Sequence, residues 1–118
     1  MNIIFAPQIT DHIREKYTLL ELDSFWMTGL QEPVAAYCLL DAVSEDEFIA
    51  DQQFFELHSN LMHNYRSQNW NFVEHAVEHL KGRWDGQLDS FYDSLIARVQ
   101  DLRQQDISQD WDGVIDKR

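Results

Sequence analysis

The sequence of 118 residues has little cysteine, glycine or positive charge. Its one cysteine, Cys38, cannot form a disulfide within the chain, which excludes the disulfide framework of small extracellular domains. The four glycines are scattered, so no glycine-rich loop is available to hold a phosphate group. The chain contains nine Lys and Arg residues and 21 Asp and Glu residues, so its net charge is -12. Because cationic side chains dominate binding to nucleic acids and anionic membranes, neither is expected as a partner.

A long apolar run and a basic N-terminus are also missing. The start, Met1–Pro7, therefore predicts neither a signal peptide nor a membrane anchor, and a cytoplasmic location is expected. Hydrophobic residues nevertheless make up 44% of the chain and aromatic residues 13%, which is enough for a packed core. We expect a single domain over residues 1–118, in which Cys38 is a buried, unreactive thiol within the apolar run 34–40.

Residues 44–104 have the periodicity of a helical core. Ser44 followed by Glu47 predicts a helix start with Val43 and Phe48 as the flanking apolar pair, and this helix runs towards Gln68. Its apolar face repeats every three or four residues, at Phe54, Leu57, Leu61 and Tyr65.

Two further helices are predicted after this one. The first opens at Asn71 as its cap and ends at Gly82, which suits a left-handed C-terminal position. The second follows the Asp85-Gly86 turn and has an apolar face at Leu88, Phe91, Tyr92, Leu95, Val99 and Leu102. The short connections predict antiparallel packing of neighbouring helices.

The first 43 residues are harder to assign. Thr10 and Asp11 can cap a short turn that ends near Tyr17. The apolar runs 17–26 and 34–43 fit either two short helices or a β-hairpin, and partial alternation favours strands. The predicted fold is mainly α: an antiparallel helical hairpin and a third long helix, with the N-terminal β-hairpin as an α+β variant. Residues 105–118 are expected to form an acidic tail.

Several aromatic and turn residues lie at the ends of the predicted helices and in the segment after them. Tyr65-Arg66 is followed by Trp70, then by the Asp85-Gly86 turn, and the chain closes on Asp110-Trp111-Asp112-Gly113-Val114. In this order, residues 54–114 resemble the short helical tail after the catalytic domain of many bacterial class III nucleotide cyclases, and Tyr65–Leu80 resembles a tetratricopeptide-type hairpin. Val73 departs from the small residue usual there, and no cyclase catalytic domain precedes the segment. The resemblance therefore implies a helical interaction or regulatory unit without cyclase activity.

One short motif has the spacing of a metal site. His75 and His79, with Glu78 beside them, match the His-x-x-Glu-His spacing of inverted zinc peptidases. On a helical wheel both histidines lie opposite Val73 and Val77 and should face solvent. They are retained as candidate metal ligands, but no metal or cofactor is expected, and no catalytic residue is assigned.

The predicted function is a non-enzymatic protein-interaction or regulatory module. We expect Tyr65, Trp70, Trp84 and Trp111 to bind a protein partner or a second copy of the chain. Trp111 either folds back onto the helices or anchors a docking peptide. Two alternatives stay open: an acidic, phage-like inhibitor that mimics DNA and binds a basic protein, and a zinc-dependent hydrolase that uses His75 and His79.

Overall fold

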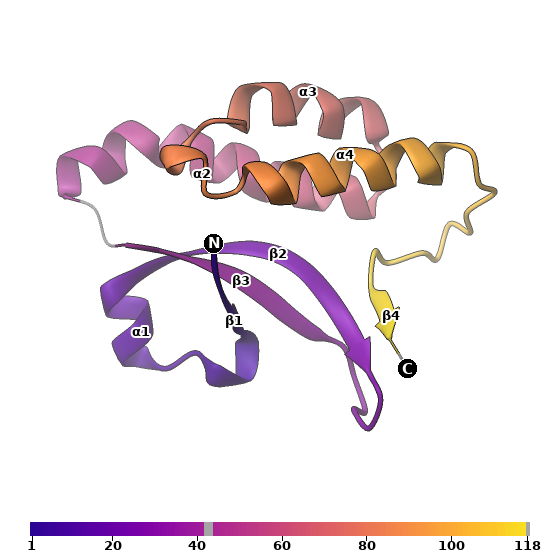
Figure 1. Ribbon diagram of the computed structural model, residues 1–118, viewed down its shortest axis with the longest axis horizontal. Coiled ribbons are helices and arrows are strands. Elements are labelled where there is room, and N and C mark those ends of the chain that lie inside the picture. Colours follow the sequence, from indigo (N-terminus) through magenta and orange to yellow (C-terminus); the bar gives the residue numbers. More distant parts are fainter. Residues whose placement is uncertain (42–43, 118) are drawn as a thin grey trace. The chain divides into compact units, whose positions relative to one another are not determined.

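The computed structural model describes residues 1–41 and 44–117 (Figure 1). The chain divides into two compact units, one formed by Met1–Phe55 with Gly113–Arg118 and the other by Glu56–Asp112. The first unit therefore draws on both ends of the chain, and the second is inserted between them. Each unit is considered by itself below.

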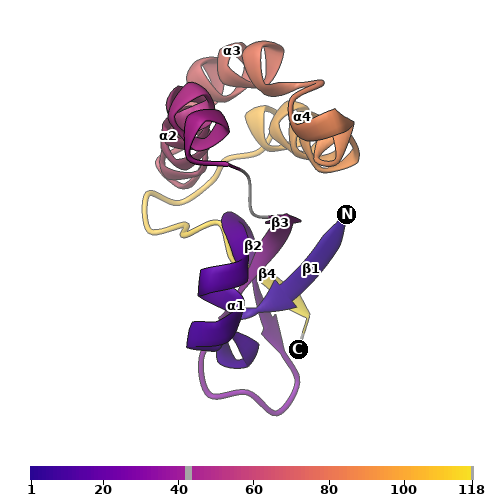
Figure 2. The same ribbon diagram turned by 90° about the vertical axis from the view of Figure 1, so that its left-hand side faces the viewer.

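The first unit contains a four-stranded sheet with the order β1-β3-β2-β4. Its strands are β1 (Asn2–Phe5), β2 (Tyr17–Met27), β3 (Val34–Asp41) and β4 (Ile115–Lys117). β2 and β3 form an antiparallel hairpin in which Leu20 lies opposite Cys38, and the register shifts between Glu21 and Ser24. β1 pairs with the outer side of β3 in the antiparallel direction (Figure 2). β4 runs parallel to β2.

The buried side chains of β3 come from alternate positions, as expected when successive side chains of a strand point to opposite faces. On β2 the alternation is interrupted where the register shifts, because the successive residues Leu22 and Asp23 are both buried. Leu20 on β2 is 5% exposed, and Cys38 opposite it is fully buried. Ala36 and Leu40 are buried on the same face of β3. Within the described residues, the apolar runs that fitted either helices or strands are thus strands, and their partial alternation was the informative signal.

Short helical segments and one long helix complete this part of the chain. η1 (Ala6–Gln8) leads into α1 (Asp11–Lys16), where the Thr10 hydroxyl accepts a hydrogen bond from the Ile13 amide at 3.3 Å. α2 (Glu45–Arg66) begins after Ser44, whose Oγ accepts from the Glu47 amide at 3.2 Å. Both predicted caps are confirmed, while Val43 lies outside the described residues. No helix in the described ranges is both long and apolar enough to cross a membrane.

The second unit is built from the end of α2, α3 (Trp70–Leu80) and α4 (Asp89–Arg103), with the short η2 (Trp84–Gly86) before α4. Lys81, just after α3, pairs with Asp93 near the start of α4, and Arg103 at the end of α4 pairs with Glu74 near the start of α3. These two pairs show that α3 and α4 are antiparallel, as their short connection predicted. Figure 1 shows the two helices side by side.

The start of α3 lies two residues before its predicted position, because Asn71 was expected as the cap. Trp70 is already helical, and Asn69 occupies the N-cap position without a side-chain cap bond. Asn71 is inside the helix, where its Oδ1 accepts a hydrogen bond from Arg103 Nη2 at 2.8 Å. The end of α3 is as expected, because Gly82 follows it with φ +88°.

The prediction of a mainly helical chain is wrong. The fold is α+β, with a mixed four-stranded sheet beside the helices. The sheet was underestimated because β1 and β4 are only four and three residues long, too short for alternation to be recognised. The segment expected to be only an acidic tail ends in β4, whose pairing partner is distant in sequence.

Candidate interaction surface

Three aromatic rings from separate segments of the second unit meet at the junction of α2 and α3. The ring centroid of Tyr65, near the end of α2, is 5.9 Å from that of Trp70 and 5.3 Å from that of Trp111. Trp70 and Trp111 are 5.7 Å apart, and all three pairs have edge-to-face geometry. Such pairs contribute about 0.5–1.5 kcal/mol each beyond the area they bury. We call Tyr65, Trp70 and Trp111 the aromatic cluster.

The three rings differ in exposure. Tyr65 is 2% exposed, whereas Trp70 and Trp111 are half-buried. The guanidinium of Arg98 lies 5.8 Å from the Tyr65 ring centroid, and its Nη1 lies 3.4 Å from the Tyr65 hydroxyl. The cluster therefore has a buried base formed by Tyr65 and two tryptophans that keep part of their surface in contact with solvent.

A hydrogen bond joins the segment after α4 to the helix junction. Gln68, between α2 and α3, donates from Nε2 to the Ser108 carbonyl at 2.8 Å. The Trp111 amide donates to the Ser108 carbonyl at 3.1 Å, so the chain turns just before the indole. Trp111 thus folds back onto the helices, which was one of the two arrangements that the sequence left open.

Trp84 is not part of the aromatic cluster. It lies in η2, where its ring centroid is 6.4 Å from that of His58. Trp84, Asp85 and Gly86 have positive φ values of 53°, 57° and 72°, a conformation that is rare for a bulky residue. Of the four aromatic residues predicted to bind a partner, three therefore lie together in the cluster. The fourth, Trp84, lies at the connection between α3 and α4.

His58 belongs to the core of the second unit. It is 1% exposed, and its Nδ1 is 2.8 Å from the hydroxyl of Tyr92, which is fully buried. Phe91 also contacts the imidazole, with ring centroids 6.3 Å apart. His58 is therefore a buried, hydrogen-bonded ring between α2 and α4.

His75 and His79 lie on the exposed side of α3, one helical turn apart. Their ring centroids are separated by 4.9 Å. Within the part of the chain that the structure describes, no group of three or more His, Cys, Asp or Glu side chains is arranged to hold a metal ion. The pair therefore has no third protein ligand among these residues, which a hydrolytic zinc site would require.

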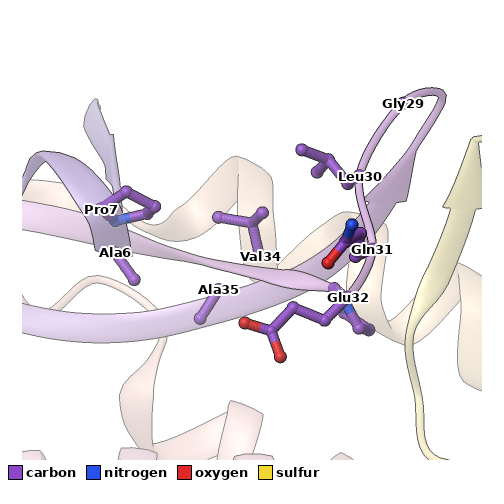
Figure 3. Close-up of a pocket in the computed structure, with 9 residues that line it drawn as sticks. Ala6, Pro7, Gly29, Leu30, Gln31, Glu32, Val34 and Ala35 are labelled. Carbon is purple, nitrogen blue, oxygen red and sulfur yellow. The ribbon is translucent and has the colours of Figure 1, made fainter.

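A groove of about 650 Å³ lies in the first unit, next to the turn between β2 and β3. Figure 3 shows Ala6 and Pro7 on one side and the loop with Leu30 and Glu32 on the other. Its lining contains one carboxylate and one amide, and otherwise Ala, Pro, Gly, Val and Leu. Glu32 is the one titratable side chain among the described lining residues, so the groove contains no nucleophile with an adjacent base.

Cys38 is fully buried on β3, one of the two inner strands of the sheet. Burial raises the pKa of its thiol from 9.0 to about 11, and the positive N-terminus opposes this shift. Well below pH 9 the thiol is predominantly neutral in both the folded and the unfolded chain. Between pH 9 and about 11 the unfolded chain ionises first, so this group lowers stability only as the pH rises through that range.

We therefore expect native Cys38 to resist alkylation. At pH 8 its reaction with a maleimide should be at least about 100-fold slower than in the urea-unfolded chain, because the raised pKa reduces the thiolate fraction and burial blocks access. Mass spectrometry of time points would measure both rates. Similar rates in the two states would contradict the burial of β3.

Several contacts around the cluster had no signal in the sequence. The bond between Gln68 and Ser108 joins residues far apart in the chain, and Arg98 reaches Tyr65 from α4. The apolar stripes predicted which helices pack, but they carry no information on these polar partners. Comparison with protein-family models, with curated proteins and with solved structures finds no match.

Proposed function

We propose that this protein is a non-enzymatic interaction module that binds a protein partner through the aromatic cluster. The observation that carries the proposal is the pairing of two half-buried tryptophans, Trp70 and Trp111, over the buried ring of Tyr65. Tryptophan and tyrosine are among the residues that contribute most to binding energy at protein interfaces. Rings that are already held in place lose little conformational freedom when a partner covers them.

The surroundings of the cluster suggest the charge of the partner. Asp110 and Asp112 flank Trp111 and are both exposed, and the whole chain carries a net charge of -12. A partner with an apolar pocket and a basic rim would complement this arrangement, since opposite charges steer encounter and set specificity. The resemblance of residues 54–114 to cyclase tails supports the same class of role.

Enzymatic alternatives have less support from the geometry. The groove beside the β2–β3 turn has one carboxylate and no base–nucleophile pair among its described lining residues. His75 and His79 are exposed to solvent, whereas activation of a metal-bound water benefits from a shaped cavity that excludes bulk water.

Replacement of Trp111 by alanine tests the proposal. Loss of an interface anchor should cost about 2 kcal/mol or more, which corresponds to roughly a 30-fold loss of affinity. The immobilised chain would be incubated with an extract of its native cells, and the retained proteins quantified against Trp111→Ala and Trp111→Phe. We expect one protein to be lost with alanine and kept, at least in part, with phenylalanine.

Phe48→Ala is the matched control, because Phe48 is an aromatic residue that is 45% exposed and lies outside the cluster. Circular dichroism of each variant would confirm that it is folded. A retained protein that is depleted equally by Phe48→Ala and Trp111→Ala, or by neither, would exclude the cluster as its binding site. Light scattering of the purified chain over a concentration series would show whether the partner is a second copy.

A further inference from the structure

The outer side of α3 presents two imidazoles on a rigid support. His75 and His79 are both exposed, while the opposite side of the helix is buried through Val73, Ala76, Val77 and Leu80. Residues four apart on a helix lie one above the other on the same face, with Cβ atoms about 5–6 Å apart. The packed side therefore fixes the backbone positions from which the two rings project.

Ring separation at this pair suits chelation of one ion. The centroids are 4.9 Å apart, and the rings are nearly perpendicular, at 76°. An ion bound by two imidazoles has nitrogen ligands at about 2.0–2.1 Å each, and exposed side chains can reach this arrangement by rotating about χ1 and χ2. Binding thus needs side-chain rotation but no change in the helix.

The chemistry of the donors limits the type of ion. Imidazole is a good ligand for zinc, nickel and copper, whereas magnesium and calcium prefer oxygen ligands. Glu78, which is exposed and adjacent in sequence to His79, adds negative charge near a bound cation. Because no third ligand is in place among the described residues, water would complete the coordination shell.

We propose that His75 and His79 together form a binding site for one divalent first-row transition-metal ion of the zinc, nickel and copper class. The site is separate from the aromatic cluster and needs no catalytic role. The interaction proposal assigns no role to these two histidines, whereas a metal site would.

Isothermal titration of the tag-free, metal-free chain with Ni²⁺ and with Zn²⁺ tests this assignment, and Mg²⁺ serves as the negative control. We expect one ion per chain, and a loss of affinity of at least about tenfold in His75→Gln and in His79→Gln, because each variant removes one of two coordinated nitrogens. His63→Gln, which removes an exposed histidine from α2, should bind like the unchanged chain.

Stoichiometry separates a shared site from independent ones. If the histidines bound ions singly, each variant would lose one ion per chain and keep its affinity, which would overturn the proposal. An unchanged affinity in His79→Gln, or an equal loss in His63→Gln, would overturn it as well. As a second readout, Ni²⁺ should raise the melting temperature of the unchanged chain and not that of His79→Gln. Trp111→Ala should still bind the ion, so this test can fail or succeed independently of partner binding.

Discussion

Replacing Tyr92 by alanine is expected to lower the free energy of unfolding by about 3–5 kcal/mol, the range for removing a large buried aromatic side chain. Tyr92 is fully buried, and its ring contacts Phe91 and His58. Alanine would leave a cavity next to His58 and would also remove the hydroxyl that lies 2.8 Å from the imidazole. Urea unfolding followed by circular dichroism would measure the change.

Tyr92→Phe separates the hydroxyl from the ring. This variant keeps the packing and removes one hydrogen-bond partner of a buried imidazole, which should cost about 1–3 kcal/mol. Ile49→Ala, at a position 62% exposed, should change stability by less than about 0.5 kcal/mol. If Tyr92→Ala were no more destabilising than Ile49→Ala, Tyr92 would not belong to the core of the second unit.

Leu95→Ala is the second substitution with a large expected effect, about 2–5 kcal/mol. Leu95 is fully buried on α4, on the same face as Phe91 and Val99. Its removal would leave a cavity on the side of α4 that packs in the unit, and closure of that cavity would require a shift of the helix. The same unfolding measurement applies.

Ile96→Ala provides the matched comparison for Leu95→Ala. Ile96 is the next residue on α4 and is half-buried, so the same kind of truncation there should cost clearly less. The two variants test which face of α4 is packed, because a one-residue step rotates the side chain by about 100° around the helix axis. Equal losses at both positions would contradict the assigned face.

The helices could be predicted from the sequence because their signals are local. Ser44 and Glu47 marked the start of α2, and Gly82 marked the end of α3 through a left-handed conformation that the structure contains. The apolar repeat of α4 predicted Phe91, Tyr92 and Leu95 as core residues, and all three are buried. Each of these signals lies within one or two helical turns of the feature that it predicts.

The sheet and the membership of the aromatic cluster could not be predicted to the same degree. β4 is a strand because β2 offers a pairing edge at Phe25–Met27, and nothing within Ile115–Lys117 itself indicates this. Trp84 was grouped with Tyr65 and Trp70 as an expected partner-binding residue, because aromatic character alone does not specify which helix connection a ring will join. In the structure Trp84 lies in η2, between α3 and α4, where its φ is positive.

The pairing of β2 with β4 has a consequence for protein synthesis. A ribosome translates Phe25–Met27 early and Ile115–Lys117 only after α4, so a nascent chain carries an unfinished sheet edge until Lys117 has been made. Unpaired strand edges can recruit strands from other chains. Premature termination after α4 would make this vulnerable state permanent, since α1 to α4 would be present and the sheet would lack β4.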